Sequence, residues 1–407
     1  MINKIKGLAD EVFPEVVRLR RAIHRNPELA FEEYETARLI TETLVGLGLD
    51  VQTGVAKTGV VATLTGGRPG PTIALRADID ALPILEENDF DFASQNPGKM
   101  HACGHDAHTS SLLGTAMILS RLREEVPGTV RLLFQPSEER IPGGAKAMIA
   151  EGALAAQKGS SAPEQVYGQH VRPDLPAGKI GVRGGRFMAS ADEMYITVHG
   201  QGGHAAEPHR LRADAVYVAA QLLVALQSVI SRNCPPDVPS VVSFGKIVAG
   251  KVPNVIPMTA RLEGTLRAMD EGWRFRAHDL IQRVVTHTAQ AFGAEATCEI
   301  AVGYPALHND VGAAALVREA AEAYAGAENV IDADLWFAAE DFAYYLHERP
   351  GCFYVLGVGN EAKGITHGLH TPRFTVDEEA LRLSPGFMAY LSVCALMRWG
   401  MRNAQTI

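Results

Sequence analysis

A thiol and an imidazole stand two positions apart in the segment 101–106 (HACGHD), directly before a predicted helix. A thiolate and an imidazole nitrogen are both good ligands for a zinc-like divalent ion, and this spacing lets Cys103 and His105 reach one ion. Taken alone, a buried cysteine beside polar residues at a helix start is an equally good interpretation. Other groups of residues favour the metal-binding hypothesis.

A pair of glutamates, Glu138 and Glu139, follows the predicted strand 129–134 in the segment 135–139 (QPSEE). Ligands of open α/β sheets bind at the carboxyl ends of the strands, which is where this pair lies. Adjacent acids point in different directions, so one can bind a metal while the other faces water. A Glu-Glu pair is more often a solvated turn, so the pair supports the site only in combination.

Two histidines complete the set. His170 follows the predicted strand 165–169, and His370 lies near the C-terminus in the segment 368–374 (GLHTPRF). Each alone is more often structural than a metal ligand. With the thiol, the first imidazole and the two glutamates, they provide ligands for two metal ions and leave one acid over.

Competing catalytic motifs are absent from the sequence. It contains no HExxH segment, no phosphate-binding loop and no GxSxG nucleophile turn. The segment 200–205 (GQGGHA) resembles a dinucleotide fingerprint, but no acid stands about twenty positions later to bind a ribose, so we expect no nicotinamide cofactor.

Composition narrows the class of protein. A chain of 407 residues is long enough for two domains, and 47% hydrophobic with 21% charged residues is typical of a globular protein. A net charge of −9 argues against nucleic acid as a partner. The N-terminus lacks an apolar signal segment, and the apolar stretch 215–230 is too short to span a bilayer, so no membrane association is expected. Five widely spaced cysteines indicate reduced thiols and a cytoplasmic protein.

Strands alternate with helices in the first part of the chain, which predicts a mostly parallel α/β sheet flanked by helices. The predicted helices span 8–25, 33–47 and 105–122, with a further one after 143–144, and the predicted strands span 60–64, 72–77, 129–134 and 165–169. The pattern returns near the C-terminus, with helices at 310–325, 340–347 and 378–399 and a strand at 352–357.

Between these parts lies a different pattern. The strands 192–199, 240–249, 257–267 and 296–302 and the helices 211–232 and 271–292 follow one another as β-α-β-β-α-β, the ferredoxin-like arrangement. We therefore expect a catalytic α/β domain formed by 1–184 and 300–407, interrupted by an inserted α+β lid or dimerisation domain at 185–299.

The sequence resembles a known family of metallopeptidases that includes aminoacylase, hippurate hydrolase and the plant auxin–amino-acid conjugate hydrolases. The likeness covers nearly the whole chain, and the segments 101–106 and 135–139 are specific to the branch of cysteine-containing N-acyl-amino-acid amidohydrolases. The matching segments are 21–28 (RAIHRNPE), 76–83 (RADIDALP), 101–106 (HACGHD), 135–139 (QPSEE) and 369–374 (LHTPRF).

The resemblance implies a zinc-exopeptidase-like fold, two divalent metal ions per chain and a role for each matching residue. It makes Glu138 the general base and acid, and it places His204 of the lid over the substrate carbonyl, often from a partner subunit. Asn254 and Arg267 match lid positions that bind the substrate carboxylate. The implied metal ligands are Cys103, His105, Glu139, His170 and His370.

The implied reaction is hydrolysis of N-acyl (acetyl, benzoyl or similar) L-amino acids by a homodimer or homotetramer joined through the lid. The alternatives with the same two-metal mechanism are a dipeptidase or carboxypeptidase and a deacetylase of the N-acetyl-diaminopimelate type. Thiolate and imidazole suit zinc, nickel or cobalt, while carboxylate ligands leave manganese open. A non-catalytic metal-binding protein would not need Glu138, and a zinc-dependent redox enzyme would need the missing nucleotide fingerprint.

Two further positions are interpreted from their sequence surroundings. Asp78 and Asp80 follow a β-rich run. Asp78 is expected to form a structural turn, with support of a metal ligand as the alternative. Arg21 and His24 are expected at the surface of a helix or in its packing.

Overall fold

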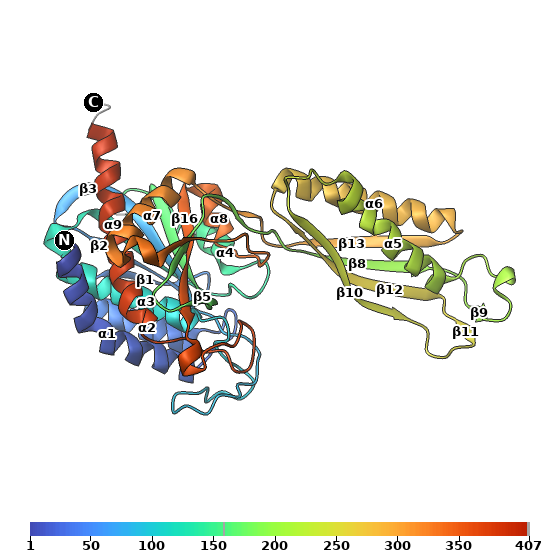
Figure 1. The fold of residues 1–407 in the computed structure, drawn as a ribbon, viewed down its shortest axis with the longest axis horizontal. Coiled ribbons are helices and arrows are strands. Elements are labelled where there is room, and N and C mark those ends of the chain that lie inside the picture. The colour runs from blue at the N-terminus through green and yellow to red at the C-terminus, as the bar shows by residue number, and fades with distance from the viewer. Residues whose placement is uncertain (158, 405–407) are drawn as a thin grey trace. The chain divides into compact units, whose positions relative to one another are not determined.

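The computed structural model describes residues 1–157 and 159–404, with side chains up to residue 398. The chain divides into two compact units (Figure 1). Unit 1 contains 1–185, 308–334 and 344–407, and unit 2 contains 186–307 and 335–343.

Unit 1 is built on an eight-stranded sheet. Its four central strands, β4, β3, β5 and β16, run parallel, whereas β1, β2 and β6 pair antiparallel to their inner neighbours. The sheet is therefore mixed, with a parallel centre. In spatial order the strands are β1 (Asp50–Val55), β2 (Gly59–Thr65), β4 (Pro127–Gln135), β3 (Arg68–Asp78), β5 (Gln165–Pro176), β16 (Gly351–Gly359), β6 (Ile180–Val182) and β15 (Val330–Asp332).

Helices cover this sheet and bury its central strands. α3 and α9 pack on β3 and on each other, and α1 packs against both helices. Every residue of α3 from His105 to Leu119 is buried, so this helix lies inside unit 1. The helices of the unit are α1 (Ile2–Arg25), α2 (Tyr34–Gly46), α3 (His105–Arg121), α4 (Gly144–Ala150), α7 (Val311–Ala325), α8 (Ala343–Glu348) and α9 (Ala380–Ala404).

Unit 2 has its own antiparallel sheet, in the order β10-β12-β8-β13, and its own hydrophobic core. Numbered along the chain this order is 2-3-1-4, the ferredoxin-like topology that the β-α-β-β-α-β pattern predicts. A two-stranded ladder of β9 and β11 extends from it. The elements are β8 (Asp192–His199), β9 (Gly203–His204), α5 (Ala215–Asn233), β10 (Ser240–Ala249), β11 (Val255–Ile256), β12 (Thr259–Ala268), α6 (Glu271–Ala291) and β13 (Glu295–Val302).

The structure differs from the expected elements in several places. The helix expected at 340–347 begins only at Ala343, and β5 continues to Pro176, well beyond the strand expected at 165–169. β1, β6, β15 and the paired short strands β7 (Gly185–Met188) and β14 (Leu307–Asn309) were not expected. Unit 2 extends to 307 rather than 299 because β13 remains paired with β8 up to Val302.

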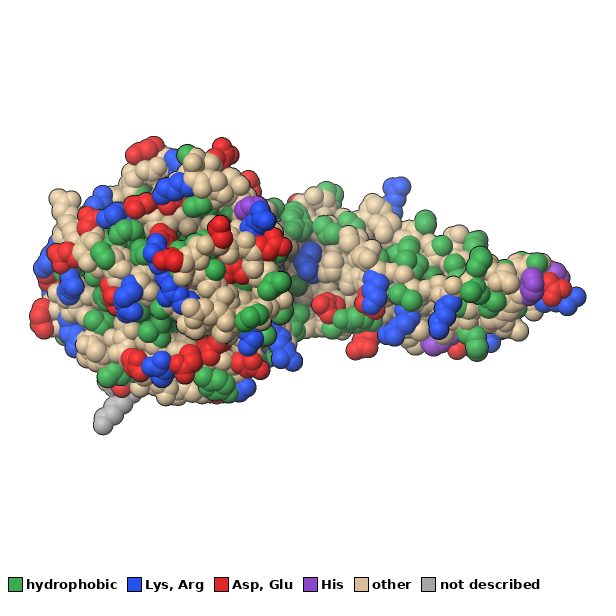
Figure 2. Space-filling model, turned by 90° about the horizontal axis from the view of Figure 1, so that it is seen from below, with side chains coloured by type: hydrophobic (Ala, Val, Ile, Leu, Met, Phe, Trp, Pro, Cys, Tyr) green, Lys and Arg blue, Asp and Glu red, His purple; other side chains and the backbone are tan. Residues whose placement is uncertain are grey.

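Two helices, α5 and the part of α9 from Ala380 to Arg398, have the length and apolar composition of a membrane span. Core helices of other proteins pass the same test, and 72% of the α9 window and 33% of the α5 window are buried. The stretch 215–230 was expected to be too short to span a bilayer, but α5 continues to Asn233 and has the necessary length. On the face of the described residues that Figure 2 shows, acidic and basic side chains are interspersed over unit 1.

Candidate metal centre

The start of α3 brings the first two candidate ligands together. Gly104, the residue between them, has φ +86°, a left-handed conformation that glycine adopts without strain. A Cβ atom at this position would lie 2.4 Å from the side chain of Val171. Gly104 therefore lets Cys103 and His105 approach β5 closely at Val171.

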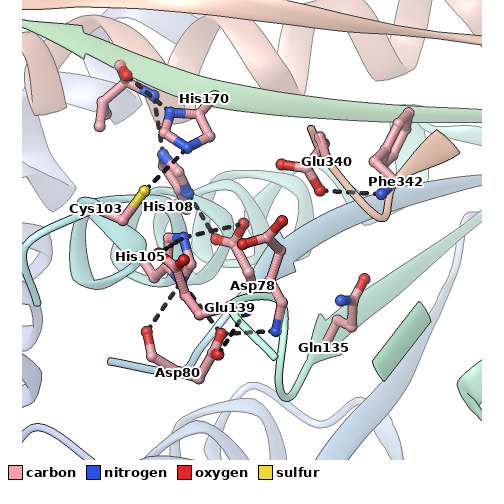
Figure 3. A network of polar contacts seen from close by, with 12 residues as sticks. Asp78, Asp80, Cys103, His105, His108, Gln135, Glu139, His170, Glu340 and Phe342 are labelled. Carbon is pink, nitrogen blue, oxygen red and sulfur yellow. Dashed lines mark hydrogen bonds and ion pairs between the residues drawn. The ribbon is translucent and has the colours of Figure 1, made fainter. Parts of the chain in front are cut away.

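The five candidate ligands converge in unit 1. Figure 3 shows four of them, Cys103, His105, Glu139 and His170. The Sγ atom of Cys103 lies 3.4 Å from Nε2 of His170 and 3.3 Å from Nε2 of His370. The Oε1 atom of Glu139 lies 3.2 Å from Nε2 of His370 and 3.9 Å from Nε2 of His105. The geometry therefore groups the ligand atoms around Cys103 and Glu139.

The residues present fit metal ions because two buried ligand atoms form no hydrogen bond within the protein. The Nδ1–H groups of His105 and His170 donate to the backbone carbonyls of Asp80 (2.9 Å) and Val171 (2.8 Å), so Nε2 is the nitrogen of each ring that could bind a metal. Nε2 of His105 and Oε1 of Glu139 are buried without a hydrogen bond. A buried polar atom without a partner is costly, and a divalent cation would satisfy both.

Electrostatics at the site are consistent with the same interpretation. Burial, together with Glu139 and Glu138, raises the pKa of the Cys103 thiol well above its usual value. Burial lowers the pKa of His105, but Asp78 and Asp80 outweigh it and raise this pKa to about 10. Binding of a divalent ion favours deprotonated ligands, so loading should release protons.

Glu138 is next to a candidate ligand but differs from it in environment. Its exposed fraction is only 6%, and the residue before it, Ser137, has φ +53°. A left-handed conformation is uncommon for a residue with a side chain and turns the chain sharply after β4. An oxygen of each glutamate lies within 4.8 Å of a ring nitrogen of His105, so both carboxylates border the ligand group.

Asp78 lies behind the candidate ligands, and its interpretation as a structural turn was wrong. It ends β3 as a fully buried residue and accepts a hydrogen bond from Nδ1 of His108 at 2.6 Å. Nε2 of His108 in turn accepts the backbone N–H of Val171, next to His170, at 2.9 Å. The sequence motif 76–83 contained this residue, but the partner on α3 is visible only in the structure.

His24 and Arg21 were expected at a helix surface or in its packing, and the structure places His24 in the packing and Arg21 at the surface. Arg21 is partly exposed and pairs with Glu378 at 2.6 Å. His24 is buried, with Nδ1 2.8 Å from Asp106 and Nε2 3.1 Å from Glu86. Asp106 belongs to the segment 101–106, so this pair also ties α1 to the start of α3.

Two of the lid residues lie together at one end of unit 2. His204 in β9 pairs with Val255 of β11, and the carbonyl of Asn254 accepts the N–H of Ala205 at 3.1 Å. Nδ1 of His204 accepts the N–H of Ala206 at 3.1 Å, so the ring proton is on Nε2. His204 can therefore donate one hydrogen bond outward from an exposed position.

Arg267 lies elsewhere in unit 2. It is near the end of β12, whereas Thr259, at the beginning of that strand, pairs with His199 near β9. Eight residues of extended strand span about 27 Å. Within one chain, the structure therefore does not bring Arg267 together with His204 and Asn254.

Comparison with known proteins identifies the family. The model of peptidase family M20/M25/M40 matches residues 74–391. The chain belongs to this family. An N-acyl-L-amino acid amidohydrolase of Geobacillus stearothermophilus is 43% identical over 76% of this chain and 82% of its own. Thermostable carboxypeptidase 2 of Saccharolobus solfataricus is 37% identical over 97% of this chain and 98% of its own.

A solved structure supports the same conclusion. The Bacillus subtilis protein YXEP, described as a dinuclear metal-binding peptidase of the M20 family, has a TM-score of 0.82 and 36% identity, covering 95% of this chain and 99% of its own. This M20 chain is therefore a metal-dependent hydrolase of amide bonds with a two-metal centre, and its five converging ligands are the residues that could hold those metals.

Proposed function

We propose that this M20 protein hydrolyses N-acyl-L-amino acids to a carboxylic acid and a free amino acid. The observation that carries the proposal is the convergence of Cys103, His105, Glu139, His170 and His370 beside the buried carboxylate of Glu138. The relative with 43% identity is named for this reaction.

Each candidate site residue has a distinct role in the proposed reaction. Two divalent ions, when bound, would polarise the amide carbonyl and make water more acidic. Glu138 accepts a proton from the attacking water and then gives it to the nitrogen of the leaving amino acid. His204 donates its Nε2–H to the carbonyl oxygen as negative charge develops there. Asn254 and Arg267 hold the α-carboxylate, which Arg267 can bind with two parallel hydrogen bonds.

We further propose that the active enzyme is a homo-oligomer, a dimer or tetramer joined through the lid. About 27 Å of strand between the His204 end of the lid and Arg267 exceeds the length of an N-acyl amino acid. If both contact one substrate, they come from different subunits. The edge strand β10 exposes Val241, Ile247 and Val248 and is a suitable surface for pairing.

The native metals and the location of the enzyme are also proposals. The mixed sulfur, nitrogen and oxygen ligands suit zinc, manganese, nickel or cobalt. All five cysteines are free thiols, which is consistent with a cytoplasmic enzyme.

A substrate panel tests the proposed function. The metal-loaded protein is assayed on N-acetyl- and N-benzoyl-amino acids, with and without a chelator and across the four metals. We expect metal-dependent hydrolysis of these amides. If protein that carries two metals per chain hydrolyses none of the N-acyl amino acids, the proposal is refuted.

The alternative with a specific observation behind it is a carboxypeptidase, because one relative carries that name. Both reactions cleave an amide next to a free α-carboxylate, so the same panel includes dipeptides and blocked peptides. A kcat/KM higher for peptides than for N-acyl amino acids would favour the alternative. An N-acetyl-diaminopimelate-type deacetylase would instead prefer a substrate with a second charged end.

A further inference from the structure

The turn that carries Glu138 is held by two buried carboxylates. The backbone N–H groups of Glu138 and Glu139 donate to Oδ1 and Oδ2 of Asp80, each at 3.0 Å. The N–H of Ser137 donates to Oε1 of Glu33 at 2.9 Å. Three successive amides of one turn thus bind two acidic side chains that come from other parts of the chain (Figure 3 shows Asp80 and Glu139).

Both carboxylates are themselves fixed. Glu33 and Asp80 are 0% and 1% exposed. Glu33 also accepts the N–H of Phe31 at 2.9 Å and the hydroxyl of Thr58. Asp80 follows β3, and its Oδ1 also lies 3.2 Å from Nδ1 of His105. Neither side chain can rotate away without leaving buried donors unpaired.

The turn needs such support because of its backbone. Ser137 is in the left-handed region, which the surrounding structure must stabilise for a residue other than glycine. The carbonyl of Ser137 is also paired, accepting the N–H of Gly144 at 3.0 Å. Loss of either carboxylate would let the turn relax and would shift the carboxylate of Glu138.

We propose that Asp80 and Glu33 are positioning residues that orient the proton-transferring carboxylate of Glu138. The inference rests on the proposed function, which assigns proton transfer to Glu138. Asp80 also contacts His105 through Oδ1, which is a different role, and the metal content of an Asp80 variant separates the two roles. The Nδ1–H of His105 donates at 2.9 Å to the backbone carbonyl of Asp80, and a change of the Asp80 side chain retains that carbonyl.

A double-mutant cycle on the metal-loaded enzyme tests the proposal. Asp80→Asn presents an amide donor to at least one backbone N–H, so kcat should fall about tenfold or more with KM nearly constant and two metals retained. Because Asp80 acts through Glu138, adding Asp80→Asn to Glu138→Gln should cost less than about twofold more. Glu28→Gln is the matched control. Glu28 binds the N–H groups of Glu35 and Thr36 and does not form part of the turn, so kcat should be unchanged.

A second readout does not depend on activity. Amide hydrogen exchange at residues 138 and 139 should be faster in Asp80→Asn than in the wild type, and exchange at 137 should be faster in Glu33→Gln. If Asp80→Asn does not fold, Glu33→Gln carries both measurements, because its side chain binds the turn at Ser137.

The outcomes separate the two proposals. Losses in kcat that multiply in the double variant, a loss of metal from Asp80→Asn, or unchanged exchange at 137–139 would each overturn the positioning role. A wild type that carries two metals and does not cleave N-acyl amino acids would refute the proposed function instead. In that case the double-mutant cycle is measured on the amide substrate that the wild type cleaves. Amide hydrogen exchange at 137–139 then decides whether Asp80 and Glu33 hold the turn.

Discussion

The Sγ atom of Cys103 lies 3.4 Å from Nε2 of His170, although the two residues are 67 positions apart. Cys103 precedes α3 and His170 lies in β5, two elements that pack against each other in unit 1. The same sulfur lies 3.3 Å from Nε2 of His370. Cys103 therefore lies between two imidazoles and belongs to two groups of possible metal ligands.

Loss of this thiol should deplete the metal centre. We expect Cys103→Ala to contain fewer than two metals per chain, with metal affinity at least about 10–100-fold weaker, because the remaining ligands lose a central partner. Metal analysis after gel filtration measures this. Cys352→Ala, which removes another fully buried thiol, should retain both metals. Two metals per chain in Cys103→Ala would make Cys103 a packing residue.

We expect the two glutamates to differ in role, with Glu138 as the general base and Glu139 as a metal ligand. Glu138→Gln is expected to retain both metals and to lower kcat by about 10²–10⁴-fold, because glutamine cannot accept the proton from water. Glu139→Gln should lose metal, since Oε1 of Glu139 lies among the imidazoles. Metal analysis and steady-state kinetics on the two variants make the comparison. The reverse pattern would mean that the roles are exchanged.

His204 should act on the reaction without affecting the metals. His204→Ala is expected to lower kcat about 10²–10³-fold, the usual effect of losing one donor to the oxyanion, with metal content unchanged. His199→Ala, an exposed histidine of the lid strand β8, is the matched control. A nearly silent His204→Ala would make this residue a polar surface group.

Mixing two inactive variants tests a site shared between subunits. When His204→Ala and Glu138→Gln chains exchange subunits, a mixed oligomer contains a site with an intact lid and an intact metal centre. We expect activity to return in part. If subunit exchange is demonstrated and activity does not return, each lid serves its own chain.

Arg267 should determine the preference for a free α-carboxylate. Burial lowers the pKa of its guanidinium, which still remains charged at neutral pH. We expect amidated substrates to be poor, and Arg267→Ala to reduce the ratio of kcat/KM between acid and amide. Arg261→Ala, on an exposed position of the same strand, should not change that ratio. Equal rates of the wild type on acid and amide would exclude this role.

The stability of the lid should fall in acid through Asp192. This carboxylate is fully buried at the start of β8 and binds Arg274 at 2.9 Å and His278 at 2.7 Å. Burial alone would raise its pKa, but the hydrogen bonds from Arg274 and His278 lower it to about 2 from the usual 3.8. Because the folded pKa is the lower one, the stabilisation is present above about pH 4 and is lost as the pH falls toward 2.

Asp192→Asn should therefore destabilise the lid at pH 7 by roughly 3 kcal/mol, because it leaves Arg274 without its buried partner. The difference from the wild type should shrink below pH 4. Calorimetric unfolding at several pH values measures it, with the exposed neighbour Glu193→Gln as control. A difference that does not depend on pH would show that the charge of Asp192 is not the cause.

Local patterns in the sequence were enough to predict much of this protein. The alternation in 192–199 predicted β8 with its observed bounds, because a half-buried strand must alternate. The combination of a thiol, three histidines and two glutamates predicted a metal centre, whereas each group alone had an ordinary structural interpretation. The segment motifs then indicated the family before any contact was known.

Other features depend on contacts between distant segments, and only the tertiary structure decided them. β6 and β15 are three residues each, too short for a periodic pattern, and exist because a neighbouring strand pairs with them. Asp78 was interpreted as part of a turn, and no partner was predicted for Asp80. Their places at and after the end of β3 set them against His108 and the Glu138 turn, which are 30 and 58 positions away. Sequence periodicity indicates which face of a helix or strand is buried. Which other element packs against that face depends on the order of the strands in the sheet, and periodicity does not contain this information.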